Sequence, residues 1–196
     1  MKKKIVLCIV LAGLIFSLAG CAEEAGQPEA GVQQENSAVS EEEFAGDGAW
    51  TILVYLCGTD LESGYGAATM DLGEMLDRDF GSQVRFVVQT GGCTQWQNEV
   101  IPEDAIARYE IINGDMQEIS RMEQANMAES ATLKDFVTFG VENYGNNKLG
   151  LIMWDHGGGS VAGVCLDENY GTDTLDLAEI QQAVSYTHLT LPTILR

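Results

Sequence analysis

The chain has 196 residues and a formal net charge of −20, with 30 acidic against 10 basic side chains. A surface of this charge repels nucleic acid and anionic lipid headgroups, which argues against a nucleic-acid partner. The five cysteines include no CxxC spacing, so neither a disulfide scaffold nor a structural zinc site is indicated. The length suffices for one ordinary domain with its own core.

Residues 1–20 have the layout of a lipoprotein signal peptide. Three lysines precede the apolar run from Ile5 to Leu18, which is shorter than the roughly 20 residues that a spanning helix needs. The run ends in Leu18-Ala19-Gly20-Cys21, which resembles a bacterial lipobox. We expect cleavage before Cys21 and its lipidation, which would anchor an exported protein to the outer face of the bacterial cell membrane. A plain secretory signal with a chance cysteine is the alternative.

Residues 21–48 are rich in Gly, Gln, Glu, Ser and Ala, and Phe44 is their only aromatic residue. Such a segment buries too little apolar surface to offset the entropy lost on ordering. We therefore predict a flexible acidic tether between the anchor and a folded domain over residues 49–184.

From residue 49 onwards, strand and helix signals alternate. Continuous apolar runs predict strands buried on both faces, and apolar residues at helical spacing predict helices. In chain order the pattern predicts a strand at 51–56, a helix at 67–80, a strand at 84–90, a hairpin of 107–113 with 116–119, a helix from a capping box at Thr132 to 144, a strand at 149–154 and a helix from Asp176. This alternation indicates an α/β sandwich with a mainly parallel sheet.

Residues 185–196 match neither the preceding helix nor the acidic domain in composition. They resemble a translated sequencing-adaptor read-through, which predicts a non-native tail in which His188 has no functional meaning. The alternative is a genuine strand that continues the sheet, with Pro192 at its end.

His156 is the strongest candidate for a catalytic side chain. It lies in Trp154-Asp155-His156-Gly157-Gly158-Gly159-Ser160, where a predicted strand ends and a glycine-rich loop begins. Functional groups gather at the carboxyl ends of strands in open α/β sheets, and a histidine there can act as general acid and base. Backbone N–H groups beside it could stabilise an oxyanion. A structural histidine at a strand end is the alternative reading.

Several further segments carry a family resemblance, and they occur in the family's order. Together with the His156 segment they resemble clostripain-family cysteine peptidases: residues 50–63, 71–75, 90–92 with Trp96, 126–127 and 132–136. The resemblance implies a caspase-like α/β/α fold and cleavage of peptides after Arg or Lys by a His/Cys dyad. It matches His156 to the catalytic histidine and Gly157 to the backbone donor of the oxyanion hole. Some members of the family respond to calcium, so calcium is a possible cofactor.

The same resemblance places the nucleophilic cysteine in a stretch like Asp-Ala-Cys, on the strand after the helix that begins near Asp176. This chain contains no such stretch, so we expect a domain truncated at its C-terminus and an isolated chain without activity. A thiolate must lie close to the imidazole. Cys57, Cys93 and Cys165 do not match the position of the family's nucleophile, and substitution by one of them is disfavoured.

Two alternatives complete the functional reading. The acidic residues Asp167, Glu168, Asp173 and Asp176 could hold a hard cation, but a solvated surface loop is the favoured interpretation, and no metal site is predicted. In place of a peptidase, the chain could be a catalytically dead extracellular lipoprotein of the same fold that binds peptides. A transporter's two-lobed substrate-binding lipoprotein would need about twice this length.

Overall fold

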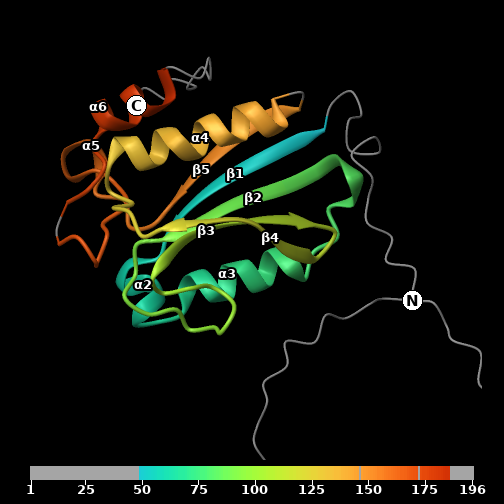
Figure 1. Ribbon diagram of the computed structural model, residues 1–196, viewed down its shortest axis with the longest axis horizontal. Coiled ribbons are helices and arrows are strands. Elements are labelled where there is room, and N and C mark those ends of the chain that lie inside the picture. The colour runs from blue at the N-terminus through green and yellow to red at the C-terminus, as the bar shows by residue number, and fades with distance from the viewer. Residues whose placement is uncertain (1–48, 146, 172, 186–196) are drawn as a thin grey trace, which may run out of the picture. The chain divides into compact units, whose positions relative to one another are not determined.

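The computed structural model describes residues 49–145, 147–171 and 173–185, which form a five-stranded sheet between two layers of helices (Figure 1). The strands are ordered β4-β3-β2-β1-β5 across the sheet. Their bounds are β1 (Trp50–Cys57), β2 (Val84–Gly91), β3 (Ala105–Ile112), β4 (Asp115–Glu123) and β5 (Lys148–Trp154). The predictions for residues 1–48 and 186–196 lie outside the described residues.

The helices lie on both faces of this sheet. The helical elements are α2 (Thr59–Ser63), α3 (Ala67–Leu76), the 3₁₀ turn η1 (Gly81–Gln83), α4 (Ser130–Tyr144), α5 (Gly159–Ala162) and α6 (Leu177–Ser185). In Figure 1, α4 and α6 lie on one face, and α2 and α3 lie on the other. The predicted α/β/α sandwich is thereby confirmed. No helix within the described ranges is long and apolar enough to cross a lipid bilayer.

The centre of the sheet is parallel and its hairpin is antiparallel. β1 pairs in parallel with both β2 and β5, whereas β3 joins β2 and β4 in antiparallel register. The register aligns Leu56 with Thr90 on one side and with Trp154 on the other. The carboxyl ends of three strands therefore meet at one end of the sheet, where functional groups are expected.

Alternate residues of β1 supply the two halves of the core. Leu53, Tyr55 and Cys57 face α4 and contact a cluster that includes Phe136 of that helix. The intervening residues of β1 pack against α3 on the opposite face. Burial of each large side chain contributes about 1.5–3 kcal/mol to folding, so β1 is stabilised from both faces, as its continuous apolar run predicts.

Two predicted helix boundaries are wrong. The helix α3 ends at Leu76 rather than Phe80, because the chain turns away and the Phe80 ring packs edge-on against Phe86, at 5.1 Å between centroids. The helix α4 begins at Ser130, so Thr132 lies inside it and does not cap it. A reciprocal capping box occurs instead before α6, where Asp176 and Glu179 exchange side-chain to backbone hydrogen bonds.

The strand β5 is less buried than the sequence predicts. Its apolar run indicates a strand covered on both faces, yet Ile152 is 45% exposed. Within the described residues β5 pairs only with β1, so it is the edge strand of this sheet. An apolar edge strand offers unpaired N–H and C=O groups to another strand.

Candidate active site

His156 is the second residue after the end of β5, at the carboxyl end of the parallel strands. Its Nε2 lies 2.9 Å from Oδ1 of Asp60, which belongs to the first turn of α2 after β1. The side chains of His156 and Asp60 are 56% and 61% exposed, so substrate groups can reach the ring. The structure therefore brings the predicted histidine next to a carboxylate that the sequence analysis did not single out.

A second carboxylate, Asp155, fixes the backbone that carries His156. Its Oδ1 accepts hydrogen bonds from Thr59 Oγ1, at 2.8 Å, and from the backbone N–H of His156. Its Oδ2 accepts the N–H of Leu166 at 2.7 Å. Burial raises the pKa of Asp155 above its ordinary value, although these three donors act in the opposite direction. Asp155 thus joins three segments of the chain at the base of the site.

Thr59 adopts a backbone conformation that is rare for a β-branched residue, with φ at +46°. Such a conformation costs on the order of 1–3 kcal/mol and persists only where surrounding contacts impose it. The contacts are present: Gly58 and Thr59 donate backbone hydrogen bonds to the carbonyls of Gly91 and Gly92. The turn that carries Asp60 is therefore tied to the end of β2 as well as to Asp155.

The acidic loop after α5 is a structural clamp, and the prediction of a solvated surface loop is wrong for Asp167. That residue is 1% exposed, and its carboxyl group accepts the backbone N–H groups of Met127 and Asn169. Glu168 reaches the neighbouring loops, where it accepts hydrogen bonds from Ser63 Oγ and from Thr94. The buried carboxyl group of Asp167 and the partly exposed one of Glu168 thus accept hydrogen bonds from backbone N–H groups of three other residues.

Glu62, a residue of α2, also holds neighbouring segments together with its carboxyl group. It is fully buried, and its two oxygens accept hydrogen bonds from the N–H and hydroxyl of Thr69 and from the N–H of Gln97. It thereby joins α2, the start of α3 and the loop after β2. Trp154 at the end of β5 adds a further tie, because its Nε1 donates to Asp71 of α3 at 2.7 Å.

The turn at residues 157–159 has few such contacts. All three glycines are exposed, and a Cβ atom at Gly157 would meet no heavy atom within 4 Å. Gly158 donates its N–H to Gly163, which closes the short helix α5. Within the part of the chain that the structure describes, the Gly157 N–H has no hydrogen-bond partner. A free backbone donor beside the imidazole is what an oxyanion hole requires.

The described cysteines are buried and do not contact His156. Cys57, Cys93 and Cys165 are at most 1% exposed, and Cys57 donates its thiol proton to the carbonyl of Leu166. The pKa of the Cys57 thiol is held well above its ordinary value, mainly by a hydrogen bond with Cys165 and secondly by burial. Burial raises the pKa of Cys93 to about 12. The nucleophile of a peptidase must be an accessible thiolate, so these thiols are unsuited to that role.

The described residues contain no group of three or more His, Cys, Asp or Glu side chains arranged to hold a metal ion. The carboxyl groups of the acidic loop are already occupied by backbone donors.

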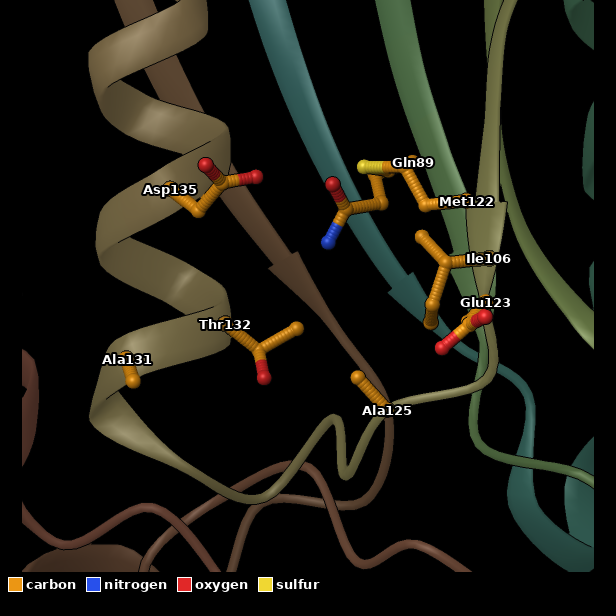
Figure 2. Close-up of a pocket in the computed structure, with 8 residues that line it drawn as sticks. All are labelled: Gln89, Ile106, Met122, Glu123, Ala125, Ala131, Thr132 and Asp135. Carbon is orange, nitrogen blue, oxygen red and sulfur yellow. The ribbon is translucent and has the colours of Figure 1, made fainter.

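A cavity of about 260 Å³ lies on the α4 face of the sheet, and His156 is not among the residues that line it (Figure 2). It lies between the first turns of α4 and the ends of β2 and β4, and its polar groups come from Gln89, Glu123, Thr132 and Asp135. Gln89 and Asp135 both bind Arg108, so this polar surface is already paired within the chain. The cavity is separate from the candidate site.

Sequence reasoning singled out His156 and Gly157 as candidates, but it did not single out Asp60, Thr59 or Asp155. A signal for Asp60 was present, because Gly58-Thr59-Asp60 follows the first buried strand directly. The strand order was the missing information. Only once β5 lies beside β1 do the residues after these two strands become neighbours.

The fold agrees with comparisons to known proteins. The model of the clostripain family matches residues 54–194. A secreted C11 cysteine protease from Bacteroides thetaiotaomicron, solved with an irreversible peptide inhibitor, is 18% identical with a TM-score of 0.53. That alignment covers 71% of this chain and 39% of the protease.

A second structure of a secreted C11 cysteine protease from the same species, named iotapain, gives 12% identity and a TM-score of 0.54. It covers 73% of this chain and 44% of that protein. At these identities the likeness establishes the fold, and this chain spans less than half of the length of either protease. No curated protein matches the chain.

Proposed function

Because this chain belongs to the clostripain family of cysteine peptidases, we propose that it supplies the histidine half of a His/Cys dyad, with His156 as general acid and base. The observation that carries the proposal is the position of His156 at the carboxyl end of β5, exposed and hydrogen-bonded to Asp60. The family acts on peptides, and His156 would take the proton of the nucleophilic thiol and return it to the leaving amine. The Gly157 N–H would bind the carbonyl oxygen as negative charge develops on it.

In this proposal the cysteine nucleophile comes from sequence beyond these 196 residues. Two observations support it: the described thiols are buried, and the apolar edge of β5 has no partner strand among the described residues. A following strand that paired in parallel with β5 would bring its carboxyl end beside His156. The isolated 196-residue chain would then have no peptidase activity.

Cleavage after Arg or Lys is the proposed specificity, and it rests on the family resemblance. The charge of the chain favours it, because 30 acidic side chains against 10 basic ones attract cationic peptides. Specificity within basic peptides would depend on residues next to the nucleophile.

The test uses the intact gene product, extended to the length of the matching proteases, with fluorogenic peptides that end in Arg, Lys or Ala. We expect cleavage after Arg and Lys, and a loss of at least about 100-fold in kcat for His156→Ala. Gln117→Ala, on the exposed strand β4, is the matched control and should retain full activity. Undiminished turnover by His156→Ala would remove this residue from the mechanism. An extended protein that binds these peptides without cleaving them would favour the binding lipoprotein of the same fold.

We further propose that the protein is exported and held at the outer face of the membrane by a lipid on Cys21. The order of positive segment, apolar run and lipobox supports this location. Replacement Cys21→Ser should move the protein from the membrane fraction to the soluble fraction, and continued membrane attachment would contradict the assignment.

A further inference from the structure

The geometry points to a positioning role for Asp60: we propose that its carboxylate holds Nε2 of His156, so that Nδ1 is the nitrogen that exchanges a proton with the thiol. The inference rests on the proposed dyad. It adds the residue that orients the histidine ring, Asp60, and the ring nitrogen that exchanges the proton, Nδ1. Its basis is the 2.9 Å contact between Nε2 and Asp60 Oδ1.

A carboxylate oxygen accepts hydrogen bonds and does not donate them, so Nε2 carries the proton in this contact. The neutral ring then has a bare lone pair on Nδ1, because the hydrogen bond of one ring nitrogen fixes the role of the other. In the reaction, the S–H bond of the thiol breaks and its proton passes to Nδ1, which leaves a thiolate and an imidazolium. The imidazolium retains its Nε2–H on Asp60 and later transfers the Nδ1 proton to the amine that leaves.

The turn that carries Asp60 is fixed well enough to orient a ring. Thr59, the preceding residue, donates its hydroxyl to Asp155 at 2.8 Å, and Asp155 also accepts the backbone N–H of His156. The two ends of the Asp60–His156 contact therefore share one structural support. A positioning residue needs a support of this kind, because its effect depends on holding the ring within a narrow range of orientations.

The exposure of the pair makes the role testable. Because the two side chains are more than half exposed, their contact adds little to stability, and its removal should leave the fold intact. Asp77, which caps the C-terminal end of α3, offers a matched control. Like Asp60, it is an exposed aspartate. Unlike Asp60, it does not contact His156 in the structure: the residue before it, Leu76, has its carbonyl oxygen close to Gly114 in the turn between β3 and β4.

The first experiment uses this 196-residue chain and requires no activity. ¹⁵N-labelled imidazole shifts are measured by NMR in a His188→Gln background, so that His156 gives the only histidine signal. In the neutral ring, a single tautomer separates the two nitrogen shifts widely, and exchange between tautomers narrows the separation. We expect a wide separation in the parent chain and in Asp77→Asn, and a narrower one in Asp60→Ala. An equal separation in Asp60→Ala and the parent chain would overturn the proposal.

The second experiment measures kinetics in the intact gene product. Asp60→Ala should lower kcat roughly 10- to 100-fold with KM unchanged, since the ring loses its orientation while the peptide site is unaltered. Asp60→Asn keeps an acceptor oxygen and should recover part of kcat. If the kcat of Asp60→Ala equals the kcat of the control Asp77→Asn, the proposal is also overturned. If the parent protein cleaves no peptide while Asp60→Ala still narrows the shift separation, the positioning of the ring stands and the peptidase function is the part that fails.

Discussion

Two neighbouring segments at the carboxyl end of the sheet differ sharply in how they are held. The loop from Cys165 to Asn169 is fixed by the carboxyl groups of Asp167 and Glu168 and by backbone hydrogen bonds, which together reach Gly92, Thr94 and Met127. The turn at 157–159 lies only a few residues earlier in the chain. It is exposed, and Gly157 has open space where a side chain would stand.

The difference separates the support of the site from its reactive surface. Each carboxyl oxygen of Asp167 and Glu168 in the fixed loop already accepts at least one hydrogen bond from the chain itself. Asp60 and Gly157 instead keep exposed groups that face solvent beside His156. An acidic cluster in a sequence can therefore hold loops together, and a single exposed carboxylate can lie beside the candidate catalytic ring.

The largest effect is expected when a buried carboxyl group of the support is removed. Glu62→Ala removes a fully buried carboxyl group and deprives the part-buried N–H groups of Thr69 and Gln97 of their acceptor. An unsatisfied buried donor costs about 1–3 kcal/mol, so the free energy of unfolding should fall by about 3 kcal/mol or more. Urea denaturation followed by circular dichroism measures this change. Glu74→Ala, exposed on α3, is the control and should stay within about 0.5 kcal/mol of the parent. Equal losses in both variants would mean that Glu62 does not support the site.

Much of the fold followed from periodicity in the sequence. The apolar runs at 51–56 and 84–90 gave strands, and the Asn113-Gly114 turn gave the hairpin, because these patterns encode local geometry. Helix ends were less predictable. The start of α4 at Ser130 and the end of α3 at Leu76 depend on tertiary contacts such as that between Phe80 and Phe86.

The candidate site was only half predictable, for a related reason. His156 and Gly157 stand together in one motif, so a single segment of sequence identifies them. Asp60 lies 96 residues away along the chain and meets His156 only because β1 and β5 are adjacent strands. The burial of Asp167 had no local signal either, since an acidic residue among glycines and other acids normally indicates a solvated loop.

A smaller effect should appear as a change of stability with pH. Burial, with Glu62 and Glu168 nearby, raises the pKa of Cys93 from 9.0 to about 12 in the folded chain. Between these values the folded state keeps a proton that the unfolded state releases, so stability falls as pH rises above about 9. The decline due to this thiol is at most about 1.4 kcal/mol per pH unit. The midpoint of urea unfolding is measured at pH 8 and pH 10. We expect it to fall more steeply with pH for the parent than for Cys93→Ala. If the midpoints of both proteins fall equally, the Cys93 thiol does not belong to the fixed region.

The smallest effect on stability is expected within the open turn itself. At Gly157 an added Cβ meets no atom within 4 Å, whereas at Gly158 it would lie 2.5 Å from the Cβ of Ala162 and 3.0 Å from the backbone of that residue. We therefore expect Gly157→Ala to change the free energy of unfolding by less than about 0.5 kcal/mol, and Gly158→Ala to cost about 1–3 kcal/mol. Since alanine retains the backbone N–H, Gly157→Ala in the intact gene product should also keep kcat within a few-fold. A large loss of stability at Gly157 would show that this turn is as constrained as the loop beside it, and the separation between support and reactive surface would no longer hold.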